Sequence, residues 1–119
     1  MKTSRDAIRP YVTKDGSLIR ELLHPALHGN GRLSLAEAVV APGAVTALHR
    51  HHRAEEIYHV LAGTGRMTLG AEQFPLASGD TVCIPPGQPH RLENTGSVPL
   101  RILCCCAPAY THDDTELIG

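Results

Sequence analysis

The chain has 119 residues, which is enough for one hydrophobic core and too few for two. Eleven Lys and Arg oppose twelve Asp and Glu, so the formal net charge of −1 gives no field that would attract nucleic acid or an anionic membrane. No apolar run approaches the roughly 20 residues that cross a bilayer, and residues 1–10 lack the hydrophobic stretch of a signal peptide. We expect a single cytoplasmic domain over 1–119 with neither a nucleic-acid nor a membrane partner.

The composition predicts an all-β domain with an aliphatic core. Only one Phe, three Tyr and no Trp occur, and eleven Gly with nine Pro interrupt the chain too often for long helices. Turn signals recur at intervals of roughly 8 to 15 residues, as they do between short antiparallel strands. Runs with alternating polarity predict strands, in chain order, at 11–13, 17–23, 33–40, 56–61, 66–69, 81–84 and 100–106.

The first predicted strands form a hairpin, because Asp15-Gly16 suits the positive φ of a two-residue turn between 11–13 and 18–20. The barrel core is expected over about 11–107. The first ten and the last eight residues are expected to be arms outside the barrel. Such arms either fray or fold over a partner subunit, which would explain the apolar Ile8 and Leu117 there.

Four cysteines are present, and three of them, Cys104, Cys105 and Cys106, are adjacent. Neighbouring residues rarely reach disulfide geometry with one another, so the pattern fits neither a secreted disulfide framework nor a zinc quartet. We therefore expect reduced thiols, whose roles the pattern leaves open.

The segment 43–63 reads GAVTALHRHHRAEEIYHVLAG and contains a pair of histidines separated by one residue. Side chains alternate faces along a strand, so His49 and His51 point the same way with Cα atoms about 6 to 7 Å apart. Two imidazoles at that spacing can converge on one cation. Residues 52–55 are polar enough to turn the chain, so the next strand runs back antiparallel and places Glu56 beside the histidines.

A second segment, 79–94, reads GDTVCIPPGQPHRLEN. Its Pro85-Pro86-Gly87 predicts a rigid turn that delivers His90 to the start of a new strand. Alternation then places Asn94 on the same face as His90. His90 is therefore a fourth candidate metal ligand.

Together the two segments resemble the paired motifs of the small single-domain cupins. The first motif is Gly, five residues, His-x-His, four residues, Glu, six residues and Gly, and it is met by Gly43, His49, His51, Glu56 and Gly63. The second is Gly, five residues, Pro-x-Gly, two residues, His, three residues and Asn, and it is met by Gly79, Pro85, Gly87, His90 and Asn94.

The resemblance implies a double-stranded β-helix, or jelly-roll barrel, and a homodimer as the common assembly. It also implies a divalent transition metal held by three histidines and one glutamate, here His49, His51, Glu56 and His90. The family accepts three or four residues between the second histidine and the Glu, so Glu55 competes with Glu56, but only Glu56 has six residues before Gly63. Mixed N and O ligation suits Fe, Mn, Ni, Co, Cu or Zn and does not identify the ion.

A divalent ion with one carboxylate and neutral imidazoles keeps a charge of about +1, so we expect an anionic or chelating ligand. Four protein ligands on an octahedral ion leave two positions for water, substrate or dioxygen. Such open positions would permit catalysis.

Alternation also predicts which further side chains face the barrel interior, where they either line the pocket or only pack. Tyr58 shares the face of Glu56, and an outward Arg101 would turn alternate residues of its strand inward. The candidate pocket-lining residues are Tyr58, Asn94, Cys104 and Cys106. The residues expected on the surface or in a dimer interface are His52, Ile57, His59 and Leu61.

Family analogy favours a metal-dependent small-molecule enzyme of dioxygenase type, with an isomerase or decarboxylase as an alternative on the same site. The rival hypothesis is a non-catalytic module that senses or stores a small carboxylate or sugar. A structural metal that stabilises a dimer is less favoured, because the ligands are expected inside the barrel. Neither the substrate, the native ion nor a catalytic residue follows from the sequence.

Overall fold

Alternating apolar and polar residues form strands here because each strand buries one face and exposes the other. The computed structural model describes residues 1–119. Its elements, in chain order, are η1 (Arg5–Ala7), β1 (Tyr11–Val12), β2 (Leu18–Leu23), α1 (Pro25–His28), β3 (Ser34–Val40), β4 (His49–His51), β5 (Glu55–Ala62), β6 (Gly65–Leu69), β7 (Glu72–Leu76), β8 (Thr81–Ile84), β9 (His90–Asn94), β10 (Leu100–Ala107) and β11 (Thr115–Leu117).

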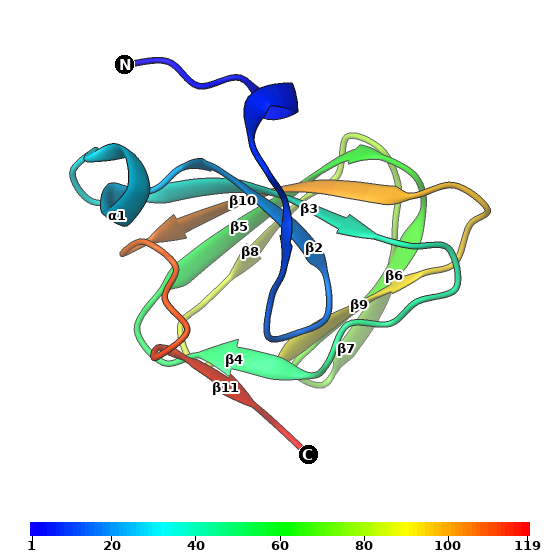
Figure 1. Cartoon of the computed structure of the whole chain (residues 1–119). Coiled ribbons are helices and arrows are strands. Elements are labelled where there is room, and N and C mark those ends of the chain that lie inside the picture. Colours follow the sequence, from blue (N-terminus) through cyan, green and yellow to red (C-terminus); the bar gives the residue numbers. More distant parts are fainter.

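The strands make two antiparallel sheets that face each other as a jelly roll (Figure 1). One sheet has the order β1-β2-β3-β10-β5-β8 and the other β11-β4-β9-β6-β7, so strands distant in sequence become neighbours. The predicted all-β jelly roll is confirmed. No helix of the structure has the length and apolarity that crossing a bilayer requires.

The interior between the sheets is filled at one end and hollow at the other. Along β10, Leu100 and Ile102 are fully buried in the aliphatic core with Met67. Further along the same face, the small side chains of β3 line a cavity together with two cysteines of β10. The small residues of β3 on this face are Ser34, Ala36 and Ala38. Because these side chains are short, they leave room where larger ones would fill the barrel.

The predicted hairpin forms between β1 and β2, but its register and its turn differ from the prediction. Tyr11 pairs with Ile19, where a two-residue turn would place Arg20, because the loop contains three residues, 14–16, between Thr13 and Ser17. The amide of Gly16 donates to the Thr13 carbonyl at 3.0 Å, and Gly16 takes the left-handed φ of 93°. A three-residue loop of this kind ends in a glycine because that φ is strained for other residues.

The C-terminal residues are not an arm outside the barrel. They form β11, which pairs with β4 so that Thr115 lies opposite His51. The sequence indicates this strand only weakly, because β11 is three residues long and follows two aspartates. Three other elements were not predicted, namely η1, α1 and β7. Pro75 is tolerated in β7 because this is an edge strand of its sheet.

The N-terminal segment is also attached to its own chain, on the outer face of the six-stranded sheet (Figure 1). Glu37 of β3 points to that face but is only 2% exposed. Its carboxylate accepts from Arg5 at 3.0 Å and from Arg101 at 2.7 Å, with Arg20 at 3.6 Å. Ionic contacts therefore attach this segment to its own sheet, so it does not fray at Arg5, whereas contact with a partner subunit stays a prediction.

Candidate metal centre

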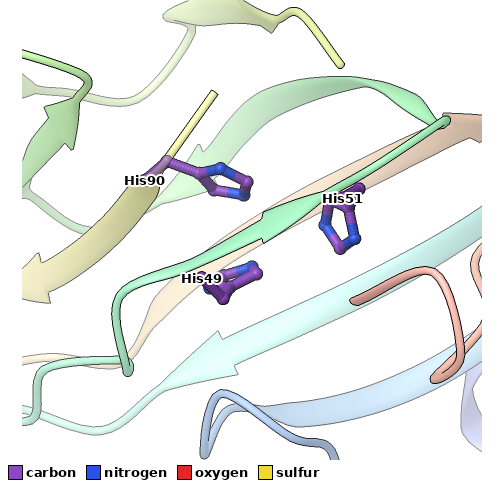
Figure 2. Close-up of side chains that lie close together, drawn as sticks. All are labelled: His49, His51 and His90. Carbon is purple, nitrogen blue, oxygen red and sulfur yellow. The ribbon is translucent and has the colours of Figure 1, made fainter. Parts of the chain in front are cut away.

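Three buried imidazoles converge inside the barrel from two neighbouring strands (Figure 2). His49 and His51 alternate with the half-buried Arg50 on β4, and His90 begins β9 directly opposite His49. One ring nitrogen of each histidine lies within 4.8 Å of those of the other two. The backbone register, and not proximity in sequence, brings His90 to the pair.

The outer nitrogen of each ring is held by a hydrogen-bond acceptor. His49 Nδ1 donates to the Ala47 carbonyl at 2.8 Å, and His90 Nδ1 donates to the Gln88 carbonyl at 2.9 Å. His51 Nδ1 lies 3.0 Å from the Thr115 hydroxyl, which itself donates to a carbonyl and so accepts from His51. Because each Nδ1 faces a hydrogen-bond acceptor, we assign the proton of each neutral ring to Nδ1. Each Nε2 then carries an unprotonated lone pair.

Glu56 of β5 adds a carboxylate to the same place. Its Oε1 lies 3.2 Å from His51 Nε2 and 3.5 Å from His90 Nε2. Burial alone would raise the pKa of Glu56, whereas His51 and His90, when they carry a proton on Nε2, lower it well below its usual range. A metal cation bound between the same groups would replace those protons and also favour the ionised carboxylate. Burial lowers the pKa of His49, and His90 lowers it further when that ring is protonated. An ionised carboxylate and a neutral imidazole at neutral pH are the forms that bind metals.

The second oxygen of Glu56 is held by Cys106, whose thiol donates to Oε2 at 3.0 Å. Burial and the adjacent Glu56 raise the pKa of Cys106, so the sulfur stays protonated and acts as a donor. All four cysteines are free thiols, as predicted. Glu55, the competing candidate, is exposed and points away from the histidines.

The donor set fits a divalent transition metal. Three imidazole lone pairs and a carboxylate oxygen face one another, and groups that only accept hydrogen bonds need a cation between them. His90 Nε2 is buried without any hydrogen-bond partner, which is costly unless another group satisfies it. The residues predicted from spacing, His49, His51, Glu56 and His90, therefore meet in one place with the chemistry of a metal site.

Asp15, which was not predicted, approaches the centre from the β1–β2 hairpin. Its Oδ1 accepts from the amide and the hydroxyl of Ser17, at 2.9 and 2.6 Å. Its Oδ2 lies 3.7 Å from His49 Nε2. The three-residue loop directs this second carboxylate towards His49. The predicted two-residue turn concerned only the backbone conformation of Asp15-Gly16 and did not indicate where the Asp15 side chain points.

The cavity beside the histidines has about 40 Å³ for the centres of water-sized molecules. That exceeds the roughly 10–15 Å³ that one water needs, so a small molecule fits and a bulky one does not. His49, His51 and Glu56 line it, as do three of the candidate pocket residues, Tyr58, Cys104 and Cys106.

Asn94, the fourth candidate pocket residue, does not line the cavity. Its side-chain amide donates to the carbonyls of Val40 and Val98, and its oxygen accepts from the amide of Gly96. The face was predicted correctly, but Asn94 lies at the far end of β9 and ties the β9–β10 turn to β3. Its function is structural.

A polar group missed by the sequence reasoning lies at the cavity mouth. Glu21 of β2 points inward and is 6% exposed, and Tyr11 donates to its Oε1 at 2.8 Å. Burial and this bond raise the pKa of Tyr11, so the phenol remains a donor. The alternation of Ile19 with Glu21 could have identified a charged residue on the buried face. Tyr110 also lines this region, from a segment that was expected to be outside any strand.

The residues expected on the outer surface lie there. His52 is exposed, and His59 contacts Thr81 on the outer face of β5. Ile57 and Leu61 share that face and are 42% and 37% exposed.

The family model described as the cupin domain matches residues 36–106, more than half of the chain and the whole of the histidine–glutamate cluster. The chain belongs to the cupin family. An uncharacterized protein of Methanocaldococcus jannaschii is 55% identical to it over 99% of the chain and 94% of the relative. The mannose-1-phosphate guanylyltransferase of Escherichia coli is 35% identical to this cupin over 70% of the chain, which spans only 18% of that enzyme's length.

Solved structures share the fold of this cupin. The oxalate decarboxylase of Lactobacillus farciminis has a TM-score of 0.81 at 20% identity, over 95% of this chain and 34% of the other. The Streptomyces nucleoside dehydratase Pac13 has a TM-score of 0.81 at 17% identity, over 99% and 90%. A predicted oxalate decarboxylase from Thermotoga maritima has a TM-score of 0.79 at 26% identity, over 91% and 99%. At the identities of the first two, the likeness is one of fold.

Proposed function

We propose that this cupin is a metal-dependent enzyme that acts on a small molecule in the cavity beside the histidines. His49, His51, Glu56 and His90 would hold a divalent transition metal. Such an ion would supply Lewis acidity, polarising an oxygen of the bound molecule. Thr115 and Cys106 orient the metal ligands His51 and Glu56, and the aliphatic barrel limits the access of water to the site.

The main support for this proposal is that the Nε2 atoms of three buried histidines and one carboxylate oxygen face one another, and that His90 Nε2 has no hydrogen-bond partner. A merely structural role for the histidines would leave His90 Nε2 unsatisfied at a cost of about 1–3 kcal/mol. The cavity next to the cluster favours chemistry over a purely structural metal, because a structural site is closed by protein ligands.

Replacement of two ligands tests the metal site. His49→Ala combined with His51→Ala should reduce the bound transition metal from about one ion per chain to a trace, because two remaining donors hold it weakly. Metal content is measured by plasma mass spectrometry on the purified full chain. His59→Ala, on the outer face, is the control and should retain the metal. Unchanged content in the double variant would reject the ligand assignment.

An oxygen-dependent reaction, the type expected from the family analogy, is tested with iron-loaded protein prepared without air. Catechols, diketones, thiols and hydroxy acids are supplied with dioxygen while its consumption is followed. A dioxygenase should consume about one dioxygen per product formed. Product formation without oxygen uptake would exclude this reaction type and leave the isomerase or decarboxylase alternative.

Asp15 favours that alternative, since its free Oδ2 is placed to exchange a proton with a molecule bound beside His49. In such a step the C–H bond breaks, the proton moves to Asp15 Oδ2 and the electron pair remains on carbon. Metal-loaded protein in deuterated water should then exchange the C3 hydrogens of 2-oxobutanoate, followed by NMR. Asp15→Asn, which can still accept from Ser17, should slow that exchange at least tenfold, and equal rates would exclude the role.

A non-catalytic binding module is the remaining candidate, with the same metal and cavity. It is distinguished by measurable binding of a small ligand with neither oxygen uptake nor hydrogen exchange across both sets of compounds.

A further inference from the structure

Glu21 is a buried carboxylate, and one of its two oxygens has no hydrogen-bond partner. Tyr11 satisfies Oε1, but Oε2 is buried and has no hydrogen-bond partner in the protein. An ionised oxygen without a donor costs more to bury than a neutral one, so a group that donates to it is expected. The metal centre does not supply that donor, because its groups are themselves acceptors.

Glu21 lies on the inner wall that leads to the centre. Across the six-stranded sheet it pairs with Ala36, which pairs with Cys104, so Glu21 is two strands, or about 10 Å, from Cys104. Burial raises the pKa of Cys104, and the charges of Glu56, Asp15 and Glu21 raise it further. All three carboxylates line the same cavity.

Glu21 also lies at the opening of that space. It lines both the inner cavity and an outer groove of about 490 Å³ beside α1, and Tyr11 and Tyr110 are the other residues common to both. A molecule that enters from the groove passes Glu21 before it reaches the histidines. One end of a bound molecule can thus meet the centre while the other meets Glu21.

The net charge of the cavity indicates which small molecules can bind in it. A divalent ion brings two positive charges, whereas Glu56, Asp15 and Glu21 bring three negative ones, so the lined cavity has one net negative charge. The anionic ligand was expected because Glu56 was the only carboxylate predicted near the divalent ion. With the two unpredicted carboxylates included, a second anionic group at the Glu21 end is repelled.

On the basis of the proposed metal-dependent function, we infer that Glu21 selects the substrate by accepting a hydrogen bond from its far end. The substrate class is a small molecule with a metal-chelating oxygen group at one end and a hydroxyl or ammonium group at the other. Dicarboxylates are disfavoured, since they present an acceptor to an acceptor. Tyr11 is a positioning residue, because its phenol fixes Oε1 and leaves Oε2 for the ligand.

Three four-carbon acids test this inference, because they share a 2-hydroxy acid head and differ only at the far end. The probes are malate, with a carboxylate there, 2,4-dihydroxybutyrate, with a hydroxyl, and 4-amino-2-hydroxybutyrate, with an ammonium. Each is titrated into the cobalt-loaded full chain, and the visible absorption of cobalt reports binding. At least one of the last two should bind about tenfold more tightly than malate, the effect of one charge-assisted hydrogen bond. Which of them does so distinguishes a hydroxyl from an ammonium ligand.

Glu21→Gln removes the charge while keeping the shape of the side chain, and should reduce that preference to about twofold or less. Glu72→Gln, an exposed glutamate on β7, is the matched control and should keep it. A preference for malate, a preference that survives Glu21→Gln, or no binding of any probe at millimolar concentrations to cobalt-loaded protein would overturn this inference alone. Wild-type protein that takes up no cobalt would instead overturn the proposed function.

Discussion

Cys106 illustrates how a single side chain outside the expected ligand set can tune the centre. Its thiol is the partner of Glu56 Oε2, and its raised pKa keeps it a donor and not a competing thiolate ligand. The cysteine therefore orients the carboxylate whose other oxygen faces the histidines. The carboxylate of Glu56 is thus held on one side and free on the other, as a metal ligand needs to be.

Removal of that thiol should weaken metal binding without abolishing it. We expect Cys106→Ala to lower the metal affinity about tenfold, because Glu56 loses the partner that orients it. Cys106→Ser should restore most of the affinity, since a hydroxyl also donates. Competition with a chelator measures the affinity, and Cys105→Ala on the outer face is the control. Equal affinities for Cys106→Ala and wild type would mean that the contact orients nothing.

Among the elements, β11 has the largest effect on the site for its length. Thr115 orients His51, and the neighbouring Asp114 accepts from the amides of Arg53 and Ala54 at 2.9 and 3.0 Å. Those two amides lie in the connection between the last histidine of β4 and the glutamate of β5. A segment that looked like a loose end thus closes the loop between two candidate ligands.

Asp114→Ala should destabilise the protein by about 1 kcal/mol at pH 7, because two backbone amides lose their acceptor. Burial would raise the pKa of Asp114, but the amide bonds from Ala54 and Arg53 outweigh it and lower the pKa. A carboxyl whose pKa is lowered by folding stabilises above its unfolded pKa of about 3.9 and stops doing so as pH falls through its folded value.

The stability difference between Asp114→Ala and wild type should therefore shrink towards zero in strong acid. Urea unfolding at pH 7 and in successively more acidic buffers measures it. Asp113→Ala, at the exposed neighbouring position, is the control and should differ little from wild type at any pH. A difference that grows as pH falls would contradict the assignment of the clamp to an ionised Asp114.

On the scale of the whole molecule, the two faces of the six-stranded sheet have different tasks. The inner face lines the cavity, while the outer face exposes Ile57 and Leu61 of β5 beside the half-buried Leu103 of β10. The N-terminal segment covers another part of that outer face through Arg5 and Glu37. An apolar patch left open next to a covered one is the kind of surface that a symmetric dimer buries.

We expect a homodimer through this patch, with a second copy of the chain as the occupant. Sedimentation velocity should give the mass of two chains for wild type and of one chain for Ile57→Glu combined with Leu61→Glu, because charges are costly to bury there. Val98→Glu, at an exposed apolar residue far along the chain, is the control and should remain dimeric. A wild-type monomer across the accessible concentration range would contradict the prediction.

Local patterns in the chain predicted most of the strands and the ligand candidates, but not β7 or β11. The alternation in His49 to His51 and the proline turn before His90 specify which side chains share a face, since a strand reverses direction of its side chains at each residue. The spacing of glycines and prolines around them carried the cupin resemblance. These features are local, so they can be read from neighbouring residues.

Only the tertiary structure decided what surrounds those ligands. Asp15 and Thr115 reach the interior through a three-residue loop and a C-terminal strand, neither of which a local pattern specifies. Alternation indicates that Glu21 and Cys106 point inward, but only the strand pairings set which groups they contact. It likewise placed Asn94 at the end of β9, away from the cavity, and brought the carboxylates of Asp15, Glu21 and Glu56 to the cavity wall. The physical reason is that burial and electrostatics depend on distances between residues far apart in the chain, and only the packing of one sheet against the other sets those distances.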